Sequence, residues 1–224
     1  MRFLCFHGRG SNSQIVETQV AALRHELDSL HEYDYVEGVI PVPLDPELRA
    51  FFPMNGEYFD YFSPNSVESV KQALDDLSEF IEINGPYDGL IAFSQGGCLA
   101  STFLIQQAIL YPKTPLPFKC AIFLSSINPT DPRALDSGDA RFLDPRVDGD
   151  QMLAGLPTAH IWGRNDTLWA NCSEMLYGLC DPRLRLLLLH DEGHAVPGVR
   201  AQEELMASVR VIRRTIERAE MSGH

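Results

Sequence analysis

Residues 89–97 read Gly-Leu-Ile-Ala-Phe-Ser-Gln-Gly-Gly, and this stretch decides how the rest of the chain is interpreted. Apolar residues lead into Ser94, glycines follow, and a helical pattern of apolar side chains begins at Cys98. This order of strand, sharp turn and helix is typical of a nucleophile elbow, which holds a serine in a strained conformation with its hydroxyl exposed. Ala92 stands where the pattern G-x-S-x-G has its first glycine, so the match is incomplete. The alternative is a buried strand before a glycine-rich turn with an incidental serine.

Strand-like apolar runs alternate with helical patterns along nearly the whole chain. We expect strands at residues 3–6, 35–41, 89–93, 120–124, 159–162 and 184–189. We expect helices over 13–30, from an Asn65 cap to Gly85, after the elbow, over 168–179 and over 199–219. This alternation predicts an α/β fold in which helices cover both faces of a doubly wound, mostly parallel sheet.

Two segments lack this periodicity and are predicted to be insertions. Residues 43–64 are rich in aromatic residues and prolines, and residues 127–150 contain six Asp and three Pro. A long segment without regular structure inside a compact domain is usually a functional loop or lid, although the rings of the first segment could also just fill a gap over the core. The candidate lining of a substrate pocket is Phe51, Phe52, Tyr58, Phe59, Tyr61 and Phe62.

The composition and the charge limit the classes of protein to consider. With 224 residues, of which 45% are hydrophobic, we expect a single domain over residues 1–224. The formal charge of −13 disfavours nucleic acids and anionic membranes as partners, and no apolar run approaches the ~20 residues of a membrane span. Five scattered cysteines favour a reducing, cytoplasmic location and no metal site or other cofactor. The first strand starts too close to Met1 to leave room for a signal peptide.

A serine nucleophile needs a base, and the base needs a carboxylate that orients it. Asp166 follows the strand expected at 159–162, and His194 follows the strand expected at 184–189. In α/β-hydrolases these residues follow in the order Ser, acid, His, each on a loop after a strand. The sequence therefore predicts a catalytic triad of Ser94, Asp166 and His194.

Other residues compete for these roles. Asp166 could cap the helix that follows it, and this role is compatible with catalysis. His190 is the rival base but lies nearer the strand end, where a structural role is favoured. Asp191 is the second-ranked acid because only three positions separate it from His194.

Acyl transfer also needs hydrogen-bond donors for the tetrahedral oxyanion, usually the backbone N–H after the nucleophile and one from the loop after an early strand. Here these are the N–H groups of Gln95 and Arg9. The alternative for residues 7–10 is a phosphate cradle, which is disfavoured because no Lys-Ser/Thr pair follows.

Two N-glycosylation sequons begin at Asn165 and Asn171. The first overlaps Asp166, where a glycan would disturb the expected acid. We therefore interpret both sequons as unused.

Five short motifs are spread over almost the whole chain. They are Leu4-Cys5-Phe6-His7-Gly8, Gly85-Pro86-Tyr87-Asp88-Gly89, Phe93-Ser94-Gln95-Gly96-Gly97, Gly163-Arg164-Asn165-Asp166 and Gly193-His194-Ala195-Val196-Pro197. In these motifs the sequence resembles the fungal FSH-type serine hydrolases, which have the α/β-hydrolase fold. The second and the last motif are more specific than the elbow. The departures are Ala92 and a short, aromatic-rich first insertion.

The resemblance implies cleavage of a thioester or ester, because this family includes small esterases and stand-alone thioesterases that act beside polyketide synthases. An acyl chain on Ser94 would then be released by water or, as a lactone, by its own hydroxyl. An acyl carrier protein of a polyketide synthase is the implied partner. Carrier proteins are generally acidic and this chain is acidic too, which speaks against that partner. An arginine set on the last expected helix could dock a carrier, although such a set is more often a solvated face: Arg200, Arg210, Arg213, Arg214 and Arg218. The alternatives are a general small-molecule carboxylesterase and an inactive ligand-binding protein with a hydrolase fold.

Overall fold

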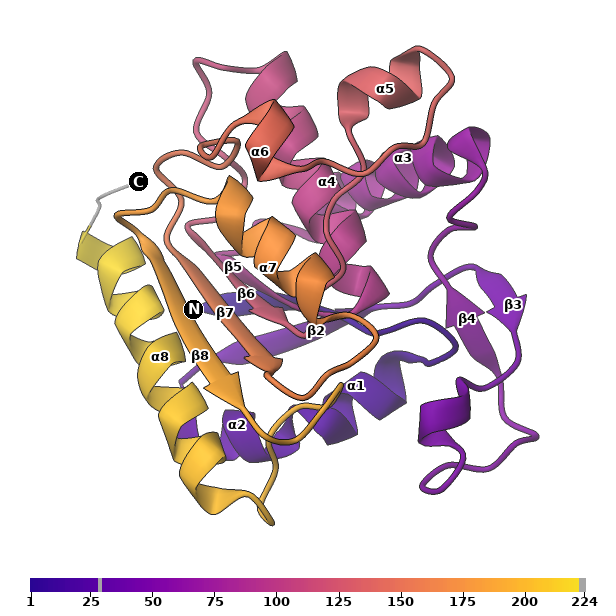
Figure 1. The fold of residues 1–224 in the computed structure, drawn as a ribbon, viewed down its shortest axis with the longest axis vertical. Coiled ribbons are helices and arrows are strands. Elements are labelled where there is room, and N and C mark those ends of the chain that lie inside the picture. The colour runs from indigo at the N-terminus through magenta and orange to yellow at the C-terminus, as the bar shows by residue number, and fades with distance from the viewer. Residues whose placement is uncertain (28–29, 222–224) are drawn as a thin grey trace.

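The centre of the fold is a six-stranded parallel sheet within residues 1–27 and 30–221, which the computed structural model describes. Its strand order is β2-β1-β5-β6-β7-β8 (Figure 1). The strands are β1 (Arg2–Phe6), β2 (Glu32–Val36), β5 (Gly89–Phe93), β6 (Cys120–Leu124), β7 (Thr158–Gly163) and β8 (Arg185–His190). All neighbouring pairs are parallel, which confirms the predicted α/β architecture.

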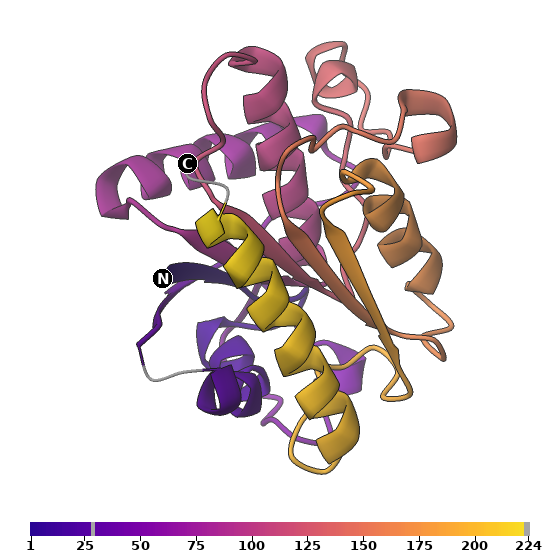
Figure 2. The ribbon, with the colours of Figure 1, turned by 90° about the vertical axis from the view of Figure 1, so that its left-hand side faces the viewer.

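Helices cover both faces of the sheet, as Figures 1 and 2 show. Because side chains alternate along a strand, Phe3 and Cys5 of β1 enter one core and Leu4 and Phe6 enter the other. The first core is closed by α1 (Ser13–Gln19), α2 (Ala21–Leu27) and α8 (Gln202–Met221). The second is closed by α3 (Val67–Asn84), α4 (Gln95–Leu110) and α7 (Ala170–Leu179). Both faces are therefore buried, as the apolar central strands require.

The predicted helix over residues 13–30 is divided into α1 and α2. Val20 lies between them with φ −91° and ψ 1°, and its N–H donates to the Val16 carbonyl oxygen. The apolar stripe continues across the break to Leu27, so the periodicity does not reveal it. Residues 28 and 29 of the prediction lie outside the described residues, and Leu30 is exposed.

The predicted strand over residues 35–41 is also divided. β2 pairs with β1, whereas β3 (Ile40–Val42) pairs with β4 (Tyr58–Asp60) in a separate antiparallel hairpin. The chain changes direction next to Gly38, where a Cβ would lie 2.7 Å from the backbone oxygen of Asp60. No side chain fits there, so the glycine permits the chain to pass close to Asp60. This bend ends β2 and starts β3.

Helix starts differ from the predictions by a few residues. The N-cap of α3 is Ser66 rather than Asn65. α7 begins at 170 rather than 168, and in the turn before it the N–H groups of Leu168 and Trp169 donate to the Asp166 carboxylate. α8 begins at 202 rather than 199.

The second predicted insertion, residues 127–150, contains two short helices, α5 (Pro132–Asp136) and α6 (Pro145–Asp148). In each, an Asp side chain caps the first turn and a proline occupies the first helical position. This pairing favours helix initiation because the aspartate accepts an otherwise unpaired N–H and the proline has none to satisfy. The Asp-Pro dipeptides were thus a readable signal for local order in a segment expected to be irregular.

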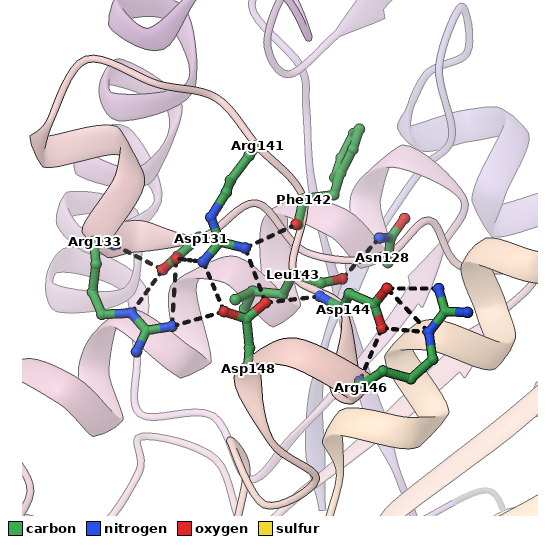
Figure 3. A network of polar contacts seen from close by, with 9 residues as sticks. All are labelled: Asn128, Asp131, Arg133, Arg141, Phe142, Leu143, Asp144, Arg146 and Asp148. Atoms are coloured by element: carbon green, nitrogen blue, oxygen red, sulfur yellow. Dashed lines mark hydrogen bonds and ion pairs between the residues drawn. The ribbon is translucent and has the colours of Figure 1, made fainter.

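Ion pairs tie this insertion together (Figure 3). The carboxylates of Asp131 and Asp148 are buried, and Arg141 lies between them, pairing with both. Arg133 adds a second contact to each carboxylate. Hydrogen bonds from Arg141 lower the pKa of Asp148 to about 2. The segment is therefore held by these ion pairs and by Leu135 and Leu143, which are buried in the second core.

Candidate active site

The three predicted catalytic side chains come together at the carboxyl ends of the strands. Ser94 follows β5, Asp166 follows β7 and His194 follows β8. His194 Nε2 lies 3.0 Å from Ser94 Oγ, and His194 Nδ1 lies 2.7 Å from Asp166 Oδ2. The Asp166 and His194 side chains are only 1% and 10% exposed, so these contacts are shielded from solvent.

The turn at Ser94 has the backbone of a nucleophile elbow. Ser94 has φ 52° and ψ −117°, a conformation that residues with a side chain rarely adopt. The glycines behind it allow the close packing that the turn needs. A Cβ on Gly96 would lie 2.5 Å from Phe6 Cβ, and one on Gly97 would lie 1.9 Å from Ser126 Oγ. Ala92 is fully buried in the core, so a methyl group is accommodated at the incomplete position of the motif.

The Asp166 carboxylate caps the turn that precedes α7 and also contacts His194, while its part in catalysis stays a prediction. Its Oδ1 accepts the N–H groups of Leu168 and Trp169 at 3.1 and 2.9 Å, while its Oδ2 faces His194. The cap fixes the carboxylate, and the fixed carboxylate orients the imidazole.

The rival residues lie elsewhere. The Asp191 carboxylate is exposed and pairs with Arg164 at 3.3 Å. His190 is buried, and its Nδ1 accepts the N–H of Glu192 at 3.2 Å. Burial lowers the pKa of His190 to about 4. The structure thus brings His194, and not His190, to Ser94.

Of the two predicted oxyanion donors, Gln95 follows Ser94 directly and Arg9 follows Gly8, which lies next to Ser94 in space. Gly8 packs against the elbow, since a Cβ there would lie 3.3 Å from Ser94 Cβ. The Gly96 N–H donates to the His7 carbonyl oxygen at 3.1 Å and ties the two loops together. Within the described ranges, the backbone N–H groups of Arg9 and Gln95 have no hydrogen-bond partner. Their oxyanion role stays a prediction.

The side chain of Gln95 has a function that the sequence did not indicate. Its Oε1 accepts the Tyr61 N–H at 3.0 Å, and its Nε2 donates to the Phe62 carbonyl oxygen at 3.1 Å. This amide fastens the end of the first insertion to the residue next to Ser94. Only the folded chain brings residues 34 positions apart into this contact.

The six predicted pocket rings do not share one environment. Tyr58, Tyr61 and Phe62 are buried, and the Tyr61 hydroxyl donates to the Val36 carbonyl oxygen. Phe51, by contrast, is 74% exposed. A cavity of about 370 Å³ between α1 and residues 52–59 is lined by Phe52, Tyr58 and Phe59 but by none of the triad residues. The role of the six aromatic residues in substrate binding stays a prediction.

Two aromatic rings that were not predicted lie beside the imidazole. The ring centroid of Phe93 is 5.2 Å from that of His194, and the centroid of Trp169 is 6.4 Å away. Phe93 precedes Ser94 directly and Trp169 follows Asp166 by three positions, so their proximity follows from the triad itself.

Two of the five arginines proposed as a docking set make intramolecular contacts. Arg213 donates to the Leu27 carbonyl oxygen at 3.2 Å, and Arg218 donates to that of Leu184 at 3.0 Å. In the part of the chain that the structure describes, no group of three or more His, Cys, Asp or Glu residues could hold a metal ion. The same residues include no helix that is both long and apolar enough for a membrane crossing.

Acid is expected to destabilise the protein because two buried histidines stay neutral in the fold. Burial lowers the pKa of His160 to about 3, as it lowers that of His190 to about 4. In the unfolded chain a histidine has a pKa of about 6.5, so below this pH the unfolded state binds protons that the folded state does not. The free energy of unfolding then falls as the pH drops from about 6.5, by up to roughly 1.4 kcal/mol per pH unit for each histidine.

Urea denaturation at several pH values between about 7.5 and about 5 measures this slope. In His160→Gln the slope should be shallower, because one of the two groups no longer titrates. A free energy of unfolding that is constant over this range would contradict the expectation.

A family model described as "Serine hydrolase (FSH1)" matches residues 1–206. Esterase FPY3 of Fusarium mangiferae is 39% identical over 202 residues, which cover 89% of each chain. Hydrolase phiM of a fungal species is 30% identical over 88% of this chain and 86% of its own. Among solved structures, a carboxylesterase from Mesorhizobium loti superimposes with a TM-score of 0.62 at 16% identity, covering 96% of this chain and 88% of that one. At that identity the likeness supports the α/β-hydrolase fold alone.

Proposed function

Because the chain belongs to the FSH1 serine hydrolase family, we propose that Ser94, His194 and Asp166 are its catalytic triad and that it cleaves thioesters or esters through an acyl-Ser94 intermediate. The observation that carries the proposal is the unbroken contact from Ser94 Oγ through both imidazole nitrogens to the Asp166 carboxylate, at 3.0 and 2.7 Å. Such a chain lets the imidazole accept the serine proton while the carboxylate stabilises the imidazolium that forms.

The contacts of His194 with Ser94 and Asp166 support the following proton transfers. His194 Nε2 removes the proton from Ser94 Oγ as the oxygen attacks the carbonyl carbon of the substrate. The N–H groups of Gln95 and Arg9 donate to the oxyanion of the tetrahedral intermediate. When the intermediate collapses, His194 gives the proton to the departing thiolate or alkoxide, and the acyl group remains on Ser94. An incoming hydroxyl then repeats the sequence, with His194 as its base.

The incoming hydroxyl decides the product. Water yields a free acid, and a hydroxyl of the acyl chain yields a lactone. We propose a polyketide acyl chain as substrate, based on the resemblance to thioesterases that act beside polyketide synthases, with an acyl carrier protein as its donor. Anchoring of Tyr61 and Phe62 by the Gln95 side chain supports a role for the first insertion in shielding the acyl-enzyme from water.

A general carboxylesterase is the second candidate, and the relative named Esterase FPY3 favours it. Substrate chain length separates the two candidates. An inactive ligand-binding protein is disfavoured because loss of catalysis usually removes at least one triad member, and all three are present and in contact.

Intact-protein mass spectrometry of the wild type and Ser94→Ala, incubated with a series of acyl thioesters including an ω-hydroxyacyl one, tests the proposal. We expect a transient acyl adduct on the wild type alone, because only its Oγ can accept the acyl group. The released product is a lactone if its mass is lower than that of the acid by one water.

The other outcomes are equally informative. Release of free acid alone from the hydroxyacyl thioester would exclude cyclisation. Faster turnover of short esters than of long acyl thioesters would favour the carboxylesterase. No turnover of any activated ester would revive the ligand-binding hypothesis.

A further inference from the structure

The loop that carries His194 has little support of its own. It joins β8 to α8 without regular structure. Among the residues that the structure describes, no hydrogen bond fixes the backbone from His194 to Pro197. Val196 packs against one core and Pro197 is buried, which fixes the loop on the C-terminal side of His194. The segment on the N-terminal side of His194 needs a separate contact to fix it.

The side chain of Asn165 fixes the segment that precedes His194. Its Oδ1 accepts the Gly193 N–H at 2.9 Å, and its Nδ2 donates to the Asp191 carbonyl oxygen at 2.7 Å. One carboxamide therefore pins the loop at two backbone positions. The Gly193 bond is the last one on the backbone before His194.

The neighbours of Asn165 bring the same two segments together. The Arg164 N–H donates to the His190 carbonyl oxygen at 2.9 Å. A Cβ on Gly163 would lie 2.2 Å from the Gly193 oxygen, so the backbone segments at Gly163 and Gly193 are in direct contact. Asn165 also precedes Asp166 directly. Its side chain thus links the backbone that presents the acid to the backbone that presents the base.

The carboxamide suits this task because it carries a donor and an acceptor side by side. An aspartate has the same shape but offers oxygen to both sites, and it would face the Asp191 carbonyl oxygen with a negative charge. An alanine would make neither bond. Asn165 is exposed, so the bonds are open to water and their contribution is one of geometry more than of stability.

We propose that Asn165 is a positioning residue that sets the distance between His194 and its two partners by clamping residues 191–193. The inference rests on the proposed function, since it assigns Asn165 a part in the reaction of the same triad. A small displacement of a base from its proton donor has a large effect on rate, whereas substrate binding does not depend on it.

Asn165→Ala and Asn165→Asp test the clamp, with Asn171→Ala and Asn171→Asp as matched controls. Asn171 is an exposed asparagine of α7, outside the 163–166 and 191–194 segments. Steady-state kinetics with an activated acyl thioester should give a kcat lower by about tenfold or more in both Asn165 variants, with KM changed by less than about threefold. Both controls should match the wild type, and thermal midpoints should agree among all five proteins.

The pH dependence of Asn165→Asp provides a readout that lost stability would not produce. A carboxyl group regains an O–H donor when it is protonated, and its ordinary pKa is about 3.9. The ratio of its kcat to that of the wild type should therefore rise between about pH 6 and about pH 4. The same ratio for Asn165→Ala should stay constant.

The proposal is wrong if Asn165→Ala keeps the wild-type kcat. It is also wrong if the Asn171 controls lose as much kcat as the Asn165 variants. A change confined to KM, or a pH-independent ratio for Asn165→Asp, would overturn it as well. Ser94→Ala, measured alongside, separates this failure from that of the proposed function. If Ser94→Ala is inactive and Asn165→Ala is fully active, only the clamp is wrong. If Ser94→Ala keeps its activity, the triad itself is wrong.

Discussion

Replacing Ser94 by alanine is expected to reduce kcat by a factor of about 10⁶ while the fold stays intact. Ser94 Oγ is the only triad atom that forms a bond to the substrate in the proposed reaction, and without it the 3.0 Å contact to His194 Nε2 has no proton to transfer. The serine hydroxyl makes no capping hydrogen bond to α4, so its loss should leave the thermal midpoint nearly unchanged. Single-turnover kinetics with an activated acyl thioester measure the loss.

Ser125→Ala is a matched control for this variant. Ser125 follows β6, the strand next to β5, and like Ser94 it is buried with a positive φ, here 41°. Its hydroxyl has no hydrogen-bond partner in the described part of the chain, so its removal should change kcat little. If the two alanine variants lose activity equally, the effect is one of packing, and Ser94 is not the nucleophile.

Asp166→Asn is expected to lower kcat by a factor of about 10⁴. The amide would retain one oxygen for the N–H groups of Leu168 and Trp169, so the cap survives. Its NH₂ would then face His194 Nδ1 and donate to it. The imidazole would carry its proton on Nε2, where it would donate to Ser94 Oγ instead of accepting from it.

The comparison with Asp166→Ala separates the two roles of this residue. Alanine removes the cap as well as the carboxylate, so it should lower the thermal midpoint, whereas Asp166→Asn should leave the midpoint unchanged. Labelling of Ser94 by a fluorophosphonate should slow in both variants. Unchanged kcat in Asp166→Asn, with Asp191→Asn inactive, would reassign the acid to Asp191.

The order of strands and loops was sufficient to predict that the three candidate side chains meet. Parallel strands present their carboxyl ends at one edge of the sheet, so residues that follow three such strands share a region of space. This is why Ser94, Asp166 and His194 could be named from the pattern although 72 and 28 positions separate successive members. The buried strands were equally readable, because parallel strands covered on both faces are continuous apolar runs.

Local patterns were not sufficient where a contact between distant segments decides the conformation. The strand predicted over 35–41 is divided because β3 pairs with β4 instead of continuing β2. The close packing of Gly38 against Asp60 permits this pairing. The aromatic residues of the first insertion looked alike in sequence, yet Phe51 is exposed and Tyr61 is buried. A ring's neighbours come from the whole fold, and no periodicity encodes them.

The sequence by itself thus determined the α/β architecture, the family and the residue types at the ends of β5, β7 and β8, because these depend on hydrophobic periodicity and on turn chemistry within a few positions. The tertiary structure alone decided which side chains hold that site in place. The amide of Gln95 reaches the first insertion, and the amide of Asn165 reaches the loop of His194. Hydrogen bonds between loops depend on distances of about 3 Å between segments that only the packed sheet brings together.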